Sequence, residues 1–216
     1  MSDELRAFLA RARGTAATAK VLSLDELQSG QQVIERWGLA AMRGRLVELS
    51  ARGATATLTT AIEIVVEAQT AAEPVCWITL GTATFYPPDA AEGGVDLSAL
   101  VVVRAADAVI AARAAEKVLR SGAFGLVVMD LGETALPAAH QGRLVTLAQA
   151  HDAAVVCLTE KTADTASLGS LVSLRAEAMR MRGPGGFDVT VRVIKDKRTG
   201  PGFQRGSAAR PPPGFK

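Results

Sequence analysis

The sequence predicts an α/β fold in which a mostly parallel β-sheet is flanked by helices and ends in antiparallel hairpin strands. The first observation is a series of short, almost continuously apolar runs that alternate with segments of helical periodicity. Such runs are typical of parallel strands covered by helices on both faces. The second observation is a change of rhythm after residue 170, where two alternating segments flank a Gly/Pro-rich turn, as in a β-hairpin.

At the N-terminus, residues 3–13 form a candidate amphipathic helix with Leu5, Phe8 and Leu9 on one face. Gly14 is suited to end this helix, and a linker rich in Thr and Ala follows. We therefore expect residues 1–20 to be an N-terminal helix and linker. Two interpretations stay open, because the helix can pack on its own domain or serve as an arm that docks on another subunit.

The regular part of the chain, residues 21–198, is expected to be the core domain. Its strands are inferred from apolar runs, and its helices from apolar residues spaced three and four apart. Pro137 suits the first turn of a helix, and Gly122 suits the end of another. The expected strands are residues 45–49, 75–79, 99–104, 125–129 and 153–158, and the expected helices are residues 55–69, 107–120 and 137–151.

The C-terminal part of the sequence has a different character. Residues 170–181 and 187–195 alternate around Arg-Gly-Pro-Gly-Gly, which predicts a hairpin. Residues 199–216 are rich in Gly, Pro and Arg without any acidic residue, so we expect an extended basic tail with no core of its own. From residue 175 onward there are ten basic and three acidic residues, and the rest of the chain is net acidic. We expect an acidic partner, protein or nucleic acid, at this end.

Composition argues against several classes of protein. No apolar run approaches the roughly 18–20 residues that cross a bilayer, and the acidic N-terminus does not resemble a signal peptide, so a cytoplasmic location is expected. Cys76 and Cys157 lie in apolar runs and are too few for a disulfide framework or a zinc site. His140 and His151 are about three turns apart on one expected helix, too far to share a metal. No metal is expected.

Several segments resemble the core of the RecA recombinase, in the same order and at nearly the same spacing. Residues 44–49 resemble its opening strand, 67–69 the end of the helix that follows, and 94–100 the approach to a later strand. Residues 119–130 resemble a helix end followed by the Walker B strand. Residues 191–197 resemble a late strand that ends in a Lys-x-Lys pair, here Lys195 and Lys197. The resemblance spans roughly residues 20–204 and implies a RecA-like core.

The positions that match the P-loop of RecA have lost its chemistry. A P-loop needs G-x-x-x-x-G-K-[ST], because its backbone N–H groups wrap the phosphates, its lysine neutralises them and its hydroxyl holds Mg²⁺. Here Ala51 and Ala56 stand at the two glycine positions, Thr57 at the lysine and Leu58 at the magnesium ligand. The missing lysine alone forfeits on the order of 4 kcal/mol toward a phosphate. No nucleotide cofactor is expected.

The catalytic and DNA-binding parts of RecA are also altered. Thr82 stands at the position of its catalytic glutamate, and threonine cannot act as a general base near neutral pH. Asp130 keeps the Walker B identity, but a lone aspartate at a strand end is more often a turn residue than a ligand. Residues 131–137 and 160–167, where the DNA-binding loops of RecA lie, are short and lack basic clusters. The chain is therefore expected not to be an enzyme.

Among RecA relatives without catalysis, the chain resembles the ImuA family more than the SulA division inhibitors. The similarity lies in the N-terminal segment, the decayed P-loop, and the Arg-rich hairpin before a Gly/Pro tail, at residues 181–184 and 197–201. Membership implies an accessory role in the SOS response to DNA damage. The implied partners are an ImuB-like protein, an error-prone DnaE-type polymerase for translesion synthesis, and RecA, whose filaments such a mimic would cap. SulA-like inhibition of cell division is the alternative.

Partner contacts are expected at the two ends of the chain. For the tail, a disordered solubilising segment is the alternative. Two further functions remain open. One is residual nucleotide binding through an atypical loop, and the other is weak or indirect DNA binding by the basic hairpin and tail, which predicts strong salt dependence. The candidate partner-binding residues are Leu5, Phe8, Leu9, Lys195, Lys197, Phe203, Arg205, Arg210, Phe215 and Lys216.

Overall fold

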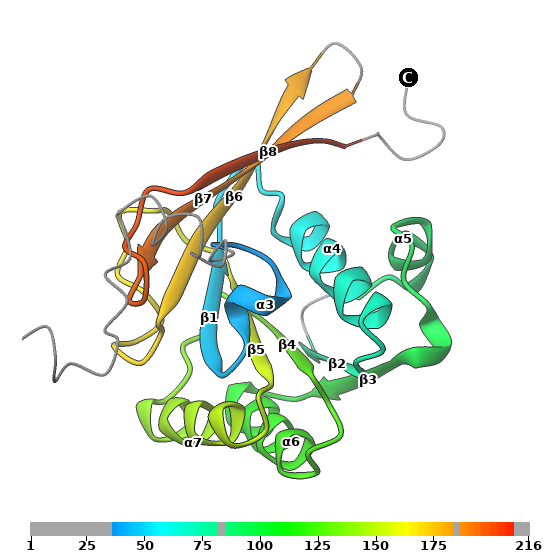
Figure 1. Ribbon diagram of the computed structural model, residues 1–216, viewed down its shortest axis with the longest axis vertical. Coiled ribbons are helices and arrows are strands. Elements are labelled where there is room, and N and C mark those ends of the chain that lie inside the picture. The colour runs from blue at the N-terminus through cyan, green and yellow to red at the C-terminus, as the bar shows by residue number, and fades with distance from the viewer. Residues whose placement is uncertain (1–35, 82–84, 184–185, 210–216) are drawn as a thin grey trace, which may run out of the picture. The chain divides into compact units, whose positions relative to one another are not determined.

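An eight-stranded sheet forms the centre of the computed structural model, which describes residues 36–81, 85–183 and 186–209 (Figure 1). The order across the sheet differs from the order along the chain. Six neighbouring strands pair in parallel and the last two are antiparallel, so the expected fold class is confirmed. Across the sheet the strands are β3 (Leu100–Ala105), β2 (Val75–Leu80), β4 (Leu126–Gly132), β5 (Ala154–Thr159), β1 (Arg45–Ser50), β6 (Leu174–Gly183), β7 (Gly186–Asp196) and β8 (Gln204–Ala209).

Helices cover both faces of this sheet. The long helices and the parallel strands match the expected segments to within a few residues at each end. The short elements α3, α5 and the 3-10 turn η1 were not predicted, because one or two turns carry too few residues to show a period. The helical elements are α3 (Leu39–Met42), α4 (Thr57–Thr70), α5 (Pro87–Glu92), η1 (Leu97–Ala99), α6 (Ala108–Arg120) and α7 (Ala138–Ala150).

The core consists of two apolar layers separated by the sheet. Neighbouring residues of a strand point to opposite faces, so Leu46 and Val47 of β1 belong to different layers. Val47 packs in the layer beneath α4, together with Ile64 and Val65 of that helix. Leu46 packs in the layer beneath α6 and α7, with residues such as Leu144. Figure 1 shows α6 and α7 together on one side and α4 on the other.

Local chemistry explains where the crossover helices begin and end. The Asp107 carboxylate accepts a hydrogen bond of 2.8 Å from the Ile110 N–H and thereby caps α6. Gly122 follows this helix with φ +68°, a left-handed conformation that favours glycine at a helix end. Pro137 is the N-terminal flanking residue of α7. Because six neighbouring strands pair in parallel, their carboxyl ends lie at the same edge of the sheet.

In the C-terminal region the structure confirms the expected hairpin and corrects the expected tail. The hairpin of β6 and β7 is present, with Arg182 opposite Phe187. The expected tail over residues 199–216 is wrong for residues 204–209, which form the edge strand β8 paired antiparallel with β7. The sequence carries little sign of this strand, because its pairing rests on backbone hydrogen bonds rather than on apolar side chains. Residues 210–216 lie outside the described residues.

No helix in the described ranges is long and apolar enough to cross a membrane. The same residues contain no group of three or more His, Cys, Asp or Glu side chains that is arranged to hold a metal ion.

Candidate functional site

The segment at the P-loop position, residues 51–56, joins the end of β1 to the start of α4. Its backbone is folded on itself: the Thr55 N–H donates to the Gly53 carbonyl at 2.8 Å. The Thr57 N–H donates to the Thr55 hydroxyl at 3.1 Å, and the two threonine hydroxyls are 2.9 Å apart. Gly53 itself has φ +82°, which this tight turn requires.

The same segment is hydrogen-bonded to strand β6. The Ala56 N–H donates to the Ala178 carbonyl, and the Arg180 N–H donates to the Ala54 carbonyl, each at 2.9 Å. These bonds flank an isolated antiparallel bridge between the two segments. A P-loop binds phosphate through free N–H groups that converge on the anion. Here the N–H groups of residues 55, 56 and 57 already have acceptors within the chain.

The side chains of the segment differ from those of a phosphate site as well. Ala51 and Ala56 are 1% and 3% exposed, so their methyl groups fill space within the protein. Leu58 is 52% exposed and offers no oxygen to a cation. Arg52 is the basic residue of this segment, and its guanidinium forms an ion pair with Glu133, which follows β4. The positive charge is thereby neutralised within the chain.

Asp130, the Walker B position, lies on β4 opposite Thr79 of β2 and Leu158 of β5. Burial raises the pKa of its carboxyl above the ordinary value, and a hydrogen bond from the Gly132 N–H opposes this shift only partly. Thr82, at the position of the catalytic glutamate, lies outside the described residues.

Glu48, in the middle of β1, lies within a cluster of polar groups. Its side chain is fully buried. One carboxylate oxygen accepts from the Thr159 hydroxyl at 2.8 Å and from the Lys161 ammonium at 2.9 Å. The other oxygen accepts from the Leu168 N–H at 2.9 Å and lies 3.6 Å from the Arg175 guanidinium. A buried carboxylate is thus balanced by two cations.

This cluster holds the loop of residues 160–173, which follows β5. Arg175 donates to the carbonyls of Thr162 and Thr165 at 2.8 and 2.5 Å, and to the Ser50 hydroxyl at 3.1 Å. A second DNA-binding loop of RecA lies at this place in the resemblance described above. In this chain, backbone atoms at several points along the loop are bonded to buried side chains, so the loop is held against the sheet.

The two lysines expected to bind a partner contact this same loop. Lys195 on β7 donates to the Ser167 hydroxyl at 3.1 Å, and Lys197 donates to the Ser170 carbonyl at 2.6 Å. Burial, with the neighbouring positive charges of Lys197 and Arg175, lowers the pKa of Lys195, although Glu48 opposes the shift. The amino groups of Lys195 and Lys197 therefore help to hold the loop of residues 160–173 against the C-terminal strands.

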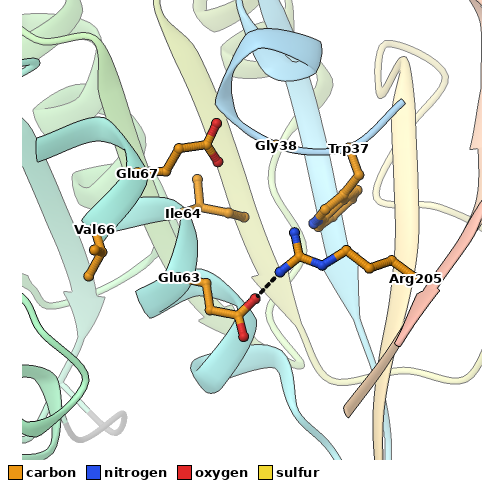
Figure 2. A pocket seen from close by; sticks show the side chains of 7 residues that line it. All are labelled: Trp37, Gly38, Glu63, Ile64, Val66, Glu67 and Arg205. Atoms are coloured by element: carbon orange, nitrogen blue, oxygen red, sulfur yellow. Dashed lines mark hydrogen bonds and ion pairs between the residues drawn. The ribbon is translucent and has the colours of Figure 1, made fainter. Parts of the chain in front are cut away.

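Phe203 and Arg205, also expected to bind a partner, are engaged within the chain. The Phe203 ring packs against the core layer beneath α4, so it is not part of a flexible tail. The Arg205 guanidinium on β8 forms an ion pair of 2.9 Å with Glu63 on α4, marked by the dashed line in Figure 2. The pair lies at a pocket of about 360 Å³ between α4, β8 and the segment before α3. Its lining residues are Trp37, Gly38, Glu63, Ile64, Val66, Glu67 and Arg205.

The remaining candidate residues, Leu5, Phe8, Leu9, Arg210, Phe215 and Lys216, lie outside the described residues. The Glu48 cluster was missed at the sequence level, although a signal existed. Glu48 is the lone acidic residue of β1 and lies between Val47 and Leu49, and every residue of this strand is buried. A charge in such a strand requires a buried partner.

No family model and no curated protein sequence matches the chain. Among solved structures, the chain is similar to the crystal structure of the RadB recombinase, with a TM-score of 0.60 and 15% sequence identity. The match covers 76% of this chain and 87% of that one. At this identity the likeness shows the fold alone, which is a RecA-like recombinase fold.

Proposed function

We propose that this chain is a non-enzymatic RecA-like accessory protein that acts by binding other proteins. The observation that carries the proposal is the bonding of residues 54–56 to β6. The Ala56 N–H, a donor that a phosphate would need, is bonded to the Ala178 carbonyl, and the bond from the Arg180 N–H to the Ala54 carbonyl holds the same segment on β6. Breaking these two hydrogen bonds would cost free energy before any nucleotide contact formed. The segment also lacks the lysine whose attraction to a phosphate could offset that cost.

The proposed setting is the response to DNA damage. The sequence resemblance to the ImuA family supports this setting, and the RecA-like fold agrees with it. The proposed partners are an ImuB-like protein, an error-prone DnaE-type polymerase used in translesion synthesis, and RecA, whose recombination the chain would inhibit. A SulA-like inhibitor of cell division is the second candidate, favoured by the same loss of nucleotide chemistry.

The exposed arginines on the C-terminal strands favour protein partners over DNA, because several of them already form contacts within the chain. Arg192 forms an ion pair of 2.8 Å with Glu177, and Arg205 one of 2.9 Å with Glu63. The Arg180 guanidinium lies over the Phe187 ring. Binding to a nucleic acid backbone depends on many cations that are available to phosphates. Here several of these side chains already have partners within the chain.

The nucleotide part of the proposal is tested by calorimetric titration of the full chain with ATP and Mg²⁺. We expect no binding tighter than about 100 μM, which corresponds to roughly 5.5 kcal/mol. A recombinase with an intact P-loop, titrated in the same buffer, is the positive control. A dissociation constant below this limit would sink the claim that the site is inactive.

The partner part is tested with purified ImuB-like protein, RecA and single-stranded DNA as separate ligands of the full chain. We expect saturable binding of a protein ligand and at most weak DNA binding between 50 and 200 mM salt, concentrations over which phosphate contacts weaken strongly. Two truncations locate the contact, one without residues 1–20 and one without residues 210–216. Truncation at residue 199 is unsuitable because it removes β8 and Phe203 from the fold. Tight, salt-sensitive DNA binding without protein binding would contradict the proposal.

A further inference from the structure

The outward side of helix α6 carries a row of cationic side chains, Arg113, Lys117 and Arg120, called here the α6 row. All three side chains are exposed. Their spacing of four and three residues places them on one side of the helix, about 10 Å from end to end. The opposite side of α6, which includes Ala112 and Leu119, packs in the core layer beneath this helix. The row therefore points into solvent.

The charges of the α6 row are not neutralised within the chain. Among the described residues, none of its three side chains forms an ion pair or a hydrogen bond. Glu116 is the lone acidic residue of α6, but it is 8% exposed and its carboxylate lies 2.7 Å from the His140 ring. The arginines of the C-terminal strands differ, because Arg192 and Arg205 each form an ion pair with a glutamate.

The neighbouring helix α7 extends this positive surface. Figure 1 shows α6 and α7 together on one side of the sheet. Arg143 of α7 is 61% exposed and lies 3.7 Å from the Glu116 carboxylate, and α7 contains no acidic residue. The two helices thus present four exposed cations and one nearly buried carboxylate, although the chain before residue 175 is net acidic. Such a local surface favours contact with an acidic partner.

Helix stability does not account for the whole row. Lys117 and Arg120 lie in the last turn of α6, where cations favour the helix dipole. Arg113 lies in the middle of the helix, beyond the reach of this effect, which falls off within the last turn. The dipole also does not require the three cations to share one side of the helix.

We propose that the α6 row binds an acidic helix of a protein partner, whose carboxylates are spaced four and three residues apart. This inference rests on the proposed function, because it gives the chemistry of the partner that the accessory protein would bind. Both helices rise about 1.5 Å per residue, so carboxylates at this spacing lie opposite the three cations. Ile110, one turn before Arg113, is 44% exposed and offers an apolar contact beside the charges.

The composition of this surface favours a protein over a nucleic acid. Tight binding to a phosphate backbone relies on many cations, on the order of 6–10, and α6 and α7 offer four. Proteins that bind single strands add aromatic side chains on which the bases stack. Neither helix contains Phe, Tyr or Trp.

The first test titrates the full chain into a labelled helical peptide of about 20 residues at about 50 mM salt, followed by fluorescence anisotropy. The peptide is alanine-based and carries three glutamates spaced four and three residues apart, with a leucine one turn away. The control peptide has glutamine in place of each glutamate. We expect the control to bind at least about tenfold more weakly. Equal binding of the two peptides, or no binding of either, would overturn the proposal.

The second test reverses charge in the row. Arg113→Glu with Lys117→Glu should weaken binding of the glutamate peptide by at least about tenfold, because like charges then face each other. Arg104→Glu with Arg182→Glu is the matched control, since both arginines are exposed and the net charge changes equally. Equal weakening by the two double variants would contradict the proposal. So would a lower melting temperature of the Arg113 and Lys117 variant without any loss of binding.

A labelled single-stranded oligonucleotide is the alternative ligand in the same assay. Tighter binding of the oligonucleotide than of the glutamate peptide would assign the row to nucleic acid and overturn the proposal. Both double variants are also titrated with the ImuB-like protein and with RecA. If a protein ligand binds both variants equally, this inference fails and the proposed function stands. If neither protein binds the wild-type chain, the proposed function loses its support, and the peptide titrations still decide the role of the row.

Discussion

The guanidinium of Arg45 on β1 lies 2.5 Å from the carboxylate of Asp196 at the end of β7, and both side chains are 3% exposed. Arg45 also donates to the Ser173 hydroxyl and carbonyl, at 2.8 and 2.6 Å. The pair thus ties a central parallel strand to the end of the antiparallel hairpin. Removing one member of such a buried pair leaves the other charge without compensation.

We predict that Arg45→Met lowers the free energy of unfolding by about 3–5 kcal/mol, measured by urea denaturation. The matched control is Arg52→Met. Arg52 also forms an ion pair, with Glu133, but its side chain is 53% exposed. An exposed pair is worth about 0–1 kcal/mol, so the control should change little. Equal losses in the two variants would show that burial of the Arg45 pair is not the deciding factor.

The pH dependence of stability should report on Asp196. Burial opposes ionisation of this carboxyl, but hydrogen bonds from the Thr199 hydroxyl, the Arg198 N–H and Arg45 outweigh it and lower the pKa. The ionised form therefore stabilises the fold above the unfolded pKa of about 3.9, and this stabilisation is lost as pH falls through the folded pKa. We predict that Asp196→Asn is most destabilising near pH 7, and that the difference from wild type shrinks below about pH 4. Melting curves of both proteins between pH 2 and 7 measure this difference in stability.

Glu48→Gln should destabilise the protein and release the loop of residues 160–173. The substitution leaves the cations of Lys161 and Arg175 in a buried site without their carboxylate, at a cost of about 3–5 kcal/mol. We expect faster amide hydrogen exchange within the loop and a lower urea midpoint. Glu160→Gln, an exposed neutralisation at the start of the same loop, is the control. Unchanged exchange in Glu48→Gln would mean that the loop is held by other contacts.

Asp130→Asn should stabilise the protein at neutral pH. Burial raises the pKa of this carboxyl in the folded state, so the fold is favoured while the group is protonated. That advantage is fully present below the unfolded pKa and is lost as pH rises through the folded pKa. The amide removes the cost of an ionised buried carboxylate at pH 7, so the melting temperature should rise there. The control is Asp164→Asn at an exposed site, which should leave the melting temperature unchanged. A lower melting temperature for Asp130→Asn would show that the ionised carboxylate stabilises the fold.

Restoring the P-loop residues should not restore ATP binding. The variant Ala51→Gly, Ala56→Gly, Thr57→Lys, Leu58→Thr supplies the missing residue types, yet residues 54–56 remain hydrogen-bonded to β6. We expect calorimetry with ATP and Mg²⁺ to give no dissociation constant below about 100 μM. Binding in the low micromolar range would instead show that the side chains at these four positions, and not the hydrogen bonds to β6, decide whether ATP binds.

The parallel part of the fold was predictable because its signals are local. Buried strands such as residues 153–158 are continuous apolar runs, and Asp107 and Gly122 mark the two ends of one helix. The antiparallel hairpin was predictable for the same reason, since alternation and its Gly/Pro turn are adjacent in the sequence. Strand β8 was not, because its pairing with β7 depends on backbone geometry more than on side-chain pattern.

The candidate site was less predictable than the fold, because its determinants are far apart in the chain. The loss of P-loop residue types at positions 51–58 follows from the resemblance to RecA. The hydrogen bonds of Ala54 and Ala56 to β6 join segments more than one hundred residues apart, and nothing local indicates them. The same is true of Glu48 and Arg175, whose meeting requires β1 and β6 to be neighbours.

The position of β1 has a consequence for synthesis of the chain. Both of its neighbours, β5 and β6, lie more than one hundred residues later in the sequence. During translation at roughly 5–20 residues per second, on the order of 5–20 s pass between the synthesis of β1 and that of the strands it pairs with. The nascent protein therefore emerges with its central strand unpaired and depends on late, long-range closure, which slows folding and exposes the strand to aggregation.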